Sequence, residues 1–209
     1  MNRSYLRFLA TGWLFVGTQE YWVALLWRND IAGMLLAILV LETGFFTLGF
    51  LLSKAIDFRF PSLKYNDLVV YIIMGLVGLV LIEWLFAGNW PWVHPATQLT
   101  MFTTWGGGVV FARMMTDKSP ELDRVKRISL RYFLTLIVTA SVVATIFKFV
   151  NFKITFAVTY LAALFGYTFM NVFFIWIFVI DYRNAQARKD RHNVAACALE
   201  GDMACEATE

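Results

Sequence analysis

The sequence predicts an all-α integral membrane protein that folds as a bundle of six transmembrane helices. Hydrophobic residues make up 59% of its 209 residues and charged residues only 16%, and the mean hydropathy is +0.62. A soluble domain is about 45–50% apolar and about 25% charged, because it must cover its surface with polar groups. Two further observations favour a membrane protein: long apolar segments recur along the chain, and positive charges concentrate in alternate connections.

Six segments are long and apolar enough to cross a bilayer, which takes about 20 residues per helix. The first follows Arg3 and Arg7, as the apolar stretch of a signal peptide would, but no cleavage site of small residues comes after it. We therefore interpret it as an uncleaved helix. The last is long enough to tilt or to extend beyond the bilayer. We expect helices over residues 5–27, 31–53, 68–88, 98–115, 130–150 and 154–180.

Lysines and arginines alternate between the two sides of this arrangement. Fifteen of the 18 lie near the N-terminus, in or beside the connections 54–67 and 116–128, or in the C-terminal tail. The other three are Arg28, Lys148 and Lys153. Cytoplasmic connections of membrane proteins carry the excess of positive charge. The distribution therefore predicts that both termini are cytoplasmic, and we expect a plasma (inner) membrane of the bacterial type.

The chain divides into one membrane domain, residues 1–182, and a cytoplasmic tail, residues 183–209. The tail is basic at first, which suits anionic headgroups, and acidic at its end. Pro120 predicts the start of a helix at the cytoplasmic surface. Both cysteines, Cys197 and Cys205, lie in the tail, where a cytoplasmic location predicts reduced thiols.

Three carboxylates fall inside expected spans: Glu20, Glu42 and Glu83. Ionisable groups within a membrane are costly and by default mark functional sites. Glu42 lies nearest the middle of its span and is the first candidate, and Asn171 is the next deep polar group. Together these four residues predict a site for a proton, a cation or a cationic solute. The structural alternatives are a polar contact between helices for Glu20 and an interfacial position for Glu83.

Gly106, Gly107 and Gly108 occupy most of the circumference of one expected helix at a single level. Each glycine weakens a helix by about 1 kcal/mol relative to alanine. A kink or local unwinding, close packing, or a bulky ligand against the backbone would explain three in a row. The flanking pattern of a phosphate-binding loop is absent.

The residues that are missing disfavour several classes of function. The only histidines are His94 and His192, expected on opposite sides of the membrane, which argues against haem and gives no metal site. Any other cofactor stays open. The chain has no nucleotide-binding loop and no histidine for an intramembrane catalytic pair, so a non-enzymatic role is favoured. Its basic connections suit lipid headgroups better than nucleic acid.

Three functions remain, in order of preference. The first is a small transporter or channel in which the membrane carboxylates bind a proton, a cation or a cationic solute. The second is a non-catalytic membrane subunit of a larger complex, in contact with lipid or pigment, since the chain is rich in aromatic residues and has short connections. The third is a membrane enzyme that acts on a lipid through carboxylate acid–base chemistry. The expected partners are the bilayer and either another protein or further copies of the chain.

Overall fold

The computed structural model describes residues 3–23, 31–60, 66–86, 88, 95–149, 184, 187–191 and 194. The regular structure of this part of the chain is entirely helical, which confirms the all-α class. Two segments are π-helices, in which each backbone hydrogen bond spans five residues rather than the four of an α-helix. The elements are α1 (Arg3–Val23), α2 (Ile31–Ala37), the π-helix η2 (Ile38–Glu42), α3 (Thr43–Arg59), α4 (Asn66–Val77), the π-helix η3 (Gly78–Phe86), α5 (Pro95–Thr116), the 3-10 turn η4 (Pro120–Leu122) and α6 (Asp123–Phe149).

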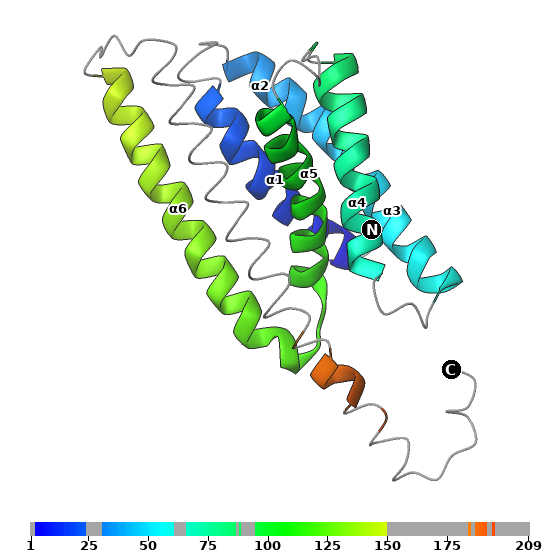
Figure 1. The fold of residues 1–209 in the computed structure, drawn as a ribbon. Coiled ribbons are helices and arrows are strands. Elements are labelled where there is room, and N and C mark those ends of the chain that lie inside the picture. Colours follow the sequence, from blue (N-terminus) through cyan, green and yellow to red (C-terminus); the bar gives the residue numbers. More distant parts are fainter. Residues whose placement is uncertain are drawn as a thin grey trace.

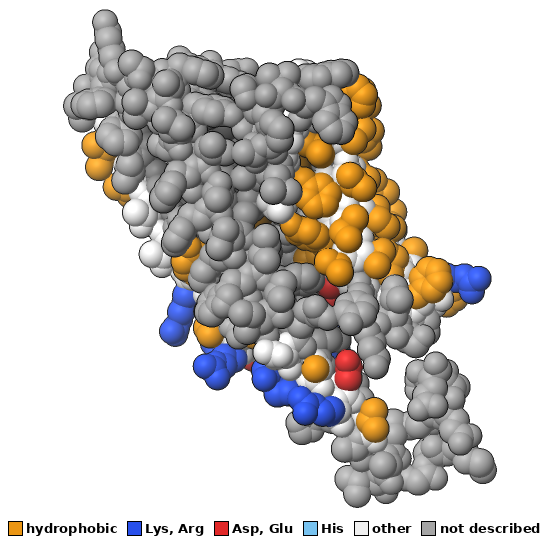
Figure 2. Space-filling view, viewed as in Figure 1, with side chains coloured by type: hydrophobic (Ala, Val, Ile, Leu, Met, Phe, Trp, Pro, Cys, Tyr) orange, Lys and Arg blue, Asp and Glu red, His pale blue; other side chains and the backbone are white. Residues whose placement is uncertain are grey.

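Two helical segments of this described part are long and apolar enough to cross a membrane. They are Leu39–Arg59, which comprises most of η2 and all of α3, and Asn66–Leu85, which comprises α4 and most of η3. Large apolar side chains of both segments are exposed, and Figure 2 shows a broad hydrophobic surface on this side of the molecule. Such a surface suits lipid better than water. The expected helix 154–180 lies outside the described residues.

Several helices extend beyond their apolar stretches at the ends expected to be cytoplasmic. The second expected helix continues to Arg59, and the fifth begins at Asp123 rather than near residue 130. Hydropathy marks the part of a helix that lies in lipid, whereas backbone hydrogen bonding continues into water. The 3-10 turn η4 begins at Pro120, where the sequence predicts a helix start, because proline is tolerated in the first turn.

Helix α5 lies at the centre of the packed helices (Figure 1). Every residue from 104 to 112 is buried, as expected for a helix surrounded by others. Its neighbour α4 is antiparallel to it, because Gly75 faces Phe102 whereas Tyr71 lies against Gly106. Tight helix contacts of this kind use small residues to bring two backbones together.

Aromatic rings join α1, α3, α5 and α6 into one core. Phe15 of α1 stacks on Phe133 of α6 with 5.1 Å between ring centroids, and it also contacts Phe111 of α5. Phe8 meets Phe46 of α3 edge to face. Each such pair contributes about 0.5–1.5 kcal/mol beyond the burial of its surface. The hydroxyls of Tyr5 and Thr47 share a hydrogen bond of 2.8 Å that also ties α1 to α3.

Candidate functional site

Glu42 is buried within an apolar helical segment. Its side chain is 2% exposed. It is the last residue of the π-helix η2 and lies four residues into the candidate span Leu39–Arg59. Burial of a carboxylate costs several kcal/mol unless the group is protonated or compensated by its surroundings. The Glu42 carboxyl must therefore be protonated or stabilised by the groups around it.

Glu83 lies in the second π-helix, η3, inside the other candidate span. Its carboxyl accepts a hydrogen bond of 3.1 Å from the indole N–H of Trp105 in α5. Trp105 is buried, and Gly78 at the start of η3 gives its side chain room. The hydrogen bond orients the Glu83 carboxyl towards the centre of the packed helices rather than leaving it only at their outer surface.

Trp105 connects the segments that carry the two carboxylates. Its ring contacts Phe45 edge to face at 4.8 Å between centroids, and Phe45 follows Glu42 by three residues, or nearly one helical turn. The same indole bonds Glu83 on the other side. The arrangement places α3, α5 and η3 around one aromatic side chain.

Both of these acids lie in π-helical turns, which sequence periodicity does not reveal. A π-helical turn changes the direction of the side chains that follow, and such turns occur frequently at functional sites. In η2 the last residue of the turn is Glu42 itself, and in η3 the turn includes Glu83. The π-helical geometry is thus a second feature, besides burial and charge, that singles out these two residues.

Gly106 and Gly108 lie where α5 approaches its neighbours most closely. A Cβ atom on Gly106 would overlap the backbone carbonyl oxygen of Tyr71, and one on Gly108 would lie 3.0 Å from a ring carbon of Phe15. Gly107 is buried in the same turn. The α-helix is continuous from Pro95 to Thr116, without the local unwinding that three glycines could produce. Among the alternatives offered by the sequence, this geometry corresponds to close packing.

The remaining two candidates are described only in part or not at all. The backbone of Glu20 is in α1, and its side chain lies outside the described atoms. Asn171 lies outside the described residues altogether. The structure therefore places Glu83 at Trp105 and Glu42 three residues before Phe45, which contacts the same tryptophan, and the participation of Glu20 and Asn171 stays a prediction.

A polar cluster that the sequence did not single out joins the ends of three helices. Arg113, near the end of α5, forms ion pairs of 2.6 Å with Asp57 of α3 and 2.8 Å with Asp67 of α4. The arginine and Asp67 side chains are 20% and 15% exposed, and Asp57 is 42% exposed. Asn66 also donates to Asp57 at 3.3 Å. In the sequence, these charged residues fall in or beside the expected connections. Their wide separation along the chain conceals the contacts between them.

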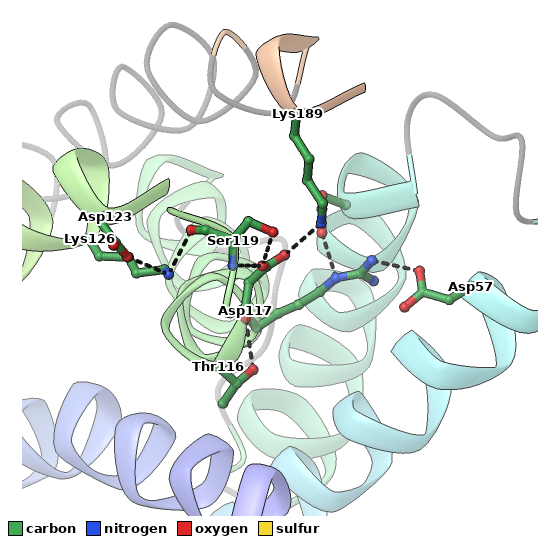
Figure 3. A network of polar contacts seen from close by, with 9 residues as sticks. Asp57, Thr116, Asp117, Ser119, Asp123, Lys126 and Lys189 are labelled. Carbon is green, nitrogen blue, oxygen red and sulfur yellow. Dashed lines mark hydrogen bonds and ion pairs between the residues drawn. The ribbon is translucent and has the colours of Figure 1, made fainter. Parts of the chain in front are cut away.

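Asp117 organises the turn between α5 and η4 (Figure 3). It accepts hydrogen bonds from the backbone N–H and the hydroxyl of Ser119 at 2.7 and 2.6 Å, and it pairs with Lys189 at 3.3 Å. Burial by itself raises the pKa of Asp117, but the Ser119 hydrogen bonds and the charge of Lys189 outweigh it. The pKa of this carboxyl therefore lies below its ordinary value.

Chemically, the carboxyls of Glu42 and Glu83 can hold protons or a cation, and the cluster around Arg113 can hold helix ends together. Within the described residues, no group of three or more His, Cys, Asp or Glu side chains is arranged to bind a metal ion. Comparison with protein-family models, with curated proteins and with solved structures finds no match.

Proposed function

We propose that the chain is a small multi-pass membrane transporter or channel that uses its membrane carboxylates to bind a proton, a cation or a cationic solute. The observation that carries the proposal is the burial of Glu42, at 2% exposure, in a π-helical turn of the candidate span Leu39–Arg59. Buried ionisable residues in membrane helices are costly and mark ion pathways and proton relays.

Glu83 supplies a second acid, in the other candidate span. The Trp105 indole donates to Glu83 and contacts Phe45, close to Glu42 in α3. Two acids in neighbouring helical segments can pass a proton or cation in stages rather than hold it at a single site. In this proposal Glu42 is the principal binding group and Glu83 the second. Glu20 and Asn171 complete the pathway.

The proposal includes six membrane spans with both termini in the cytoplasm of a cell with a plasma membrane of the bacterial type. Contacts between helix ends support it. Arg113 at the end of α5 meets Asp57 near the end of α3 and Asp67 at the start of α4. Lys189 of the tail meets Asp117 beyond the end of α5. All these charged ends thus lie together on one side, as alternating spans require.

The test is ion flux in liposomes that contain the purified full-length chain. A pH-sensitive dye inside the vesicles reports proton entry under an imposed membrane potential, and parallel vesicles test sodium, potassium and a quaternary amine. Glu42→Gln removes the titratable group with little change of shape, and we expect it to lower the flux at least tenfold. Glu121→Gln, in the 3-10 turn η4, is the matched control and should keep the flux of the unchanged protein.

Two results would contradict the proposal. One is the absence of flux above that of empty vesicles with every ion tested, for protein that elutes as a single folded species. The other is equal flux from the Glu42→Gln and Glu121→Gln variants. A Glu42→Asp variant keeps the acid but shortens it, so partial flux from this variant would link the loss to the carboxyl group itself.

The exposed apolar faces favour a second candidate, a non-catalytic subunit of a larger membrane complex. Leu36, Leu39 and Val40 are each at least 60% exposed along α2 and η2. Lipid can cover this surface, and so can a partner helix or a pigment. Purification from native membranes in a mild detergent, followed by native mass measurement, separates the two functions. A stoichiometric partner or pigment supports the subunit, and a lone chain or homo-oligomer that conducts ions supports the transporter.

A further inference from the structure

The exposed face of α6 is basic near its first residue and apolar further along the helix. Its first three turns expose Arg124, Arg127 and Arg131, and the stretch from 124 to 131 contains no acidic residue. At spacings of three and four residues, these arginines lie on one face of the helix. The face that packs against the protein is the opposite one, with Val125 and Phe133 buried.

The same exposed face becomes apolar directly beyond the last arginine. Leu134, Val138, Val142 and Ile146 are all exposed, and they continue the spacing of three and four residues. Leu134 and Ile146 are twelve residues apart, which corresponds to about 18 Å along an α-helix. One leaflet of a bilayer contributes about half of a hydrocarbon core that is about 30 Å thick. The apolar stretch thus matches the reach of one acyl chain.

The three arginines are available for a ligand. Lys126, on another side of the helix, is engaged by Asp123 at 3.1 Å and by the Ser119 carbonyl oxygen at 3.4 Å. Within the part of the chain that the structure describes, Arg124, Arg127 and Arg131 form no such ion pair or hydrogen bond. Figure 2 shows lysine and arginine side chains gathered along this end of the molecule. Guanidinium groups match the geometry of phosphate, to which they donate two hydrogen bonds at once.

We propose that α6 carries a binding site for one anionic phospholipid, with the headgroup phosphate at Arg124, Arg127 and Arg131 and an acyl chain along Leu134, Val138, Val142 and Ile146. Charge complementarity selects the anionic headgroup, and the apolar continuation of the same face selects a lipid over a soluble anion or an acidic peptide. The proposal requires the membrane location assumed above but does not depend on ion transport.

A site of this kind should retain an anionic lipid in preference to a zwitterionic one. The full-length chain in mild non-ionic detergent is titrated with phosphatidylglycerol or with phosphatidylcholine, and native mass spectrometry counts the lipids that stay bound. We expect phosphatidylglycerol to be retained at lower concentration than phosphatidylcholine. A cation near an anionic headgroup contributes about fivefold in affinity, so the variant R124Q/R127Q/R131Q should lose on the order of a hundredfold.

Two further variants distinguish a specific lipid site from general electrostatic attraction between the protein and anionic lipid. R3Q/R7Q/K118Q removes the same number of exposed charges from α1 and from the connection after α5, and it should retain phosphatidylglycerol as the unchanged chain does. R124K/R127K/R131K keeps the charge but not the guanidinium fork, and it should bind with intermediate affinity. Equal losses from the two glutamine variants would overturn the proposal, and so would equal retention of the two lipids.

A single-residue variant, phosphate competition and the Glu42→Gln variant test the lipid site further. If the triple glutamine variant does not fold, R131Q alone should weaken phosphatidylglycerol about fivefold, and unchanged affinity would count against the site. Inorganic phosphate should not displace the lipid, and displacement at millimolar phosphate would show an anion site instead. The Glu42→Gln variant should keep the lipid. If the unchanged chain gives no ion flux but retains phosphatidylglycerol selectively, the transport proposal fails and this one stands. Ion flux without selective lipid retention gives the reverse result.

Discussion

The indole N–H of Trp105 in α5 donates a hydrogen bond of 3.1 Å to the carboxyl of Glu83 in η3. The donor and acceptor are 22 residues apart in the chain and meet because α4 and η3 pack closely against α5, through Gly75 and Gly78 respectively. The contact gives Glu83, inside a candidate membrane span, a fixed polar partner. It also places that acid against the aromatic side chain that contacts Phe45, near Glu42 in the chain.

The energetic coupling between Trp105 and Glu83 is measurable. Trp105→Phe removes the donor and Glu83→Met removes the acceptor. A double-mutant cycle of the free energy of unfolding should give a coupling of about 1 kcal/mol, which is typical of a hydrogen bond in a protein or between membrane helices. Glu83→Gln keeps an oxygen that can accept the bond, so it should lose much less coupling. Additive effects of the two single changes would exclude the interaction as a stabilising contact.

Arg113 should be the most sensitive charged residue at the helix ends. Arg113→Gln leaves Asp57 and Asp67 without the cation that they share, so we expect a loss of about 2–4 kcal/mol in the free energy of unfolding. Lys118→Gln, on an exposed side chain, should change stability by less than about 0.5 kcal/mol. Chemical unfolding in detergent micelles measures both.

Asp57 and Asp67 should contribute unequally to the free energy of unfolding. Asp67 is less exposed than Asp57, so water screens its ion pair with Arg113 less. Asp67→Asn should therefore cost more stability than Asp57→Asn, and the effect of Asp57→Asn should fall more steeply with added salt. The opposite order would show that exposure does not determine the strength of these pairs.

Asp117 should stabilise the protein in a manner that depends on pH. Its contacts with Ser119 and Lys189 hold the folded-state pKa below the ordinary value of 3.8. The stabilisation is fully present above pH 3.8 and is lost as the pH falls through the folded-state pKa, because the unfolded chain binds the proton first. The difference in unfolding free energy between the unchanged chain and Asp117→Asn should be constant near neutral pH and shrink in acid. A difference that grows on acidification would contradict this assignment.

Two glycines should respond in opposite ways to alanine. A Cβ at Gly106 would overlap the carbonyl oxygen of Tyr71, which cannot turn aside as a side chain can, so Gly106→Ala should destabilise by about 1–3 kcal/mol. Gly44 in α3 has open space around it, and alanine there should stabilise the helix by up to about 1 kcal/mol. Thermal unfolding of the two variants tests the difference. Equal stability would show that α5 can move away from α4.

The sequence was sufficient to predict the all-helical class and the approximate positions of the helices in the described part of the chain. The apolar composition predicts a membrane protein, and continuous apolar segments in lipid require backbone hydrogen bonds to close within each helix. The cost of a charge in lipid also identified Glu42 and Glu83 before their surroundings were known. The six-span topology and the roles of Glu20 and Asn171 stay predictions.

The contacts around those residues were decided only by the tertiary structure. No local pattern encodes the π-helical turns η2 and η3, because they depend on how each helix packs against its neighbours. Trp105 could meet Glu83, and Arg113 could meet Asp57 and Asp67, only after residues distant in the chain were brought together. Hydrophobicity and charge act residue by residue and can be read along the sequence, whereas pairing depends on the relative position of whole helices.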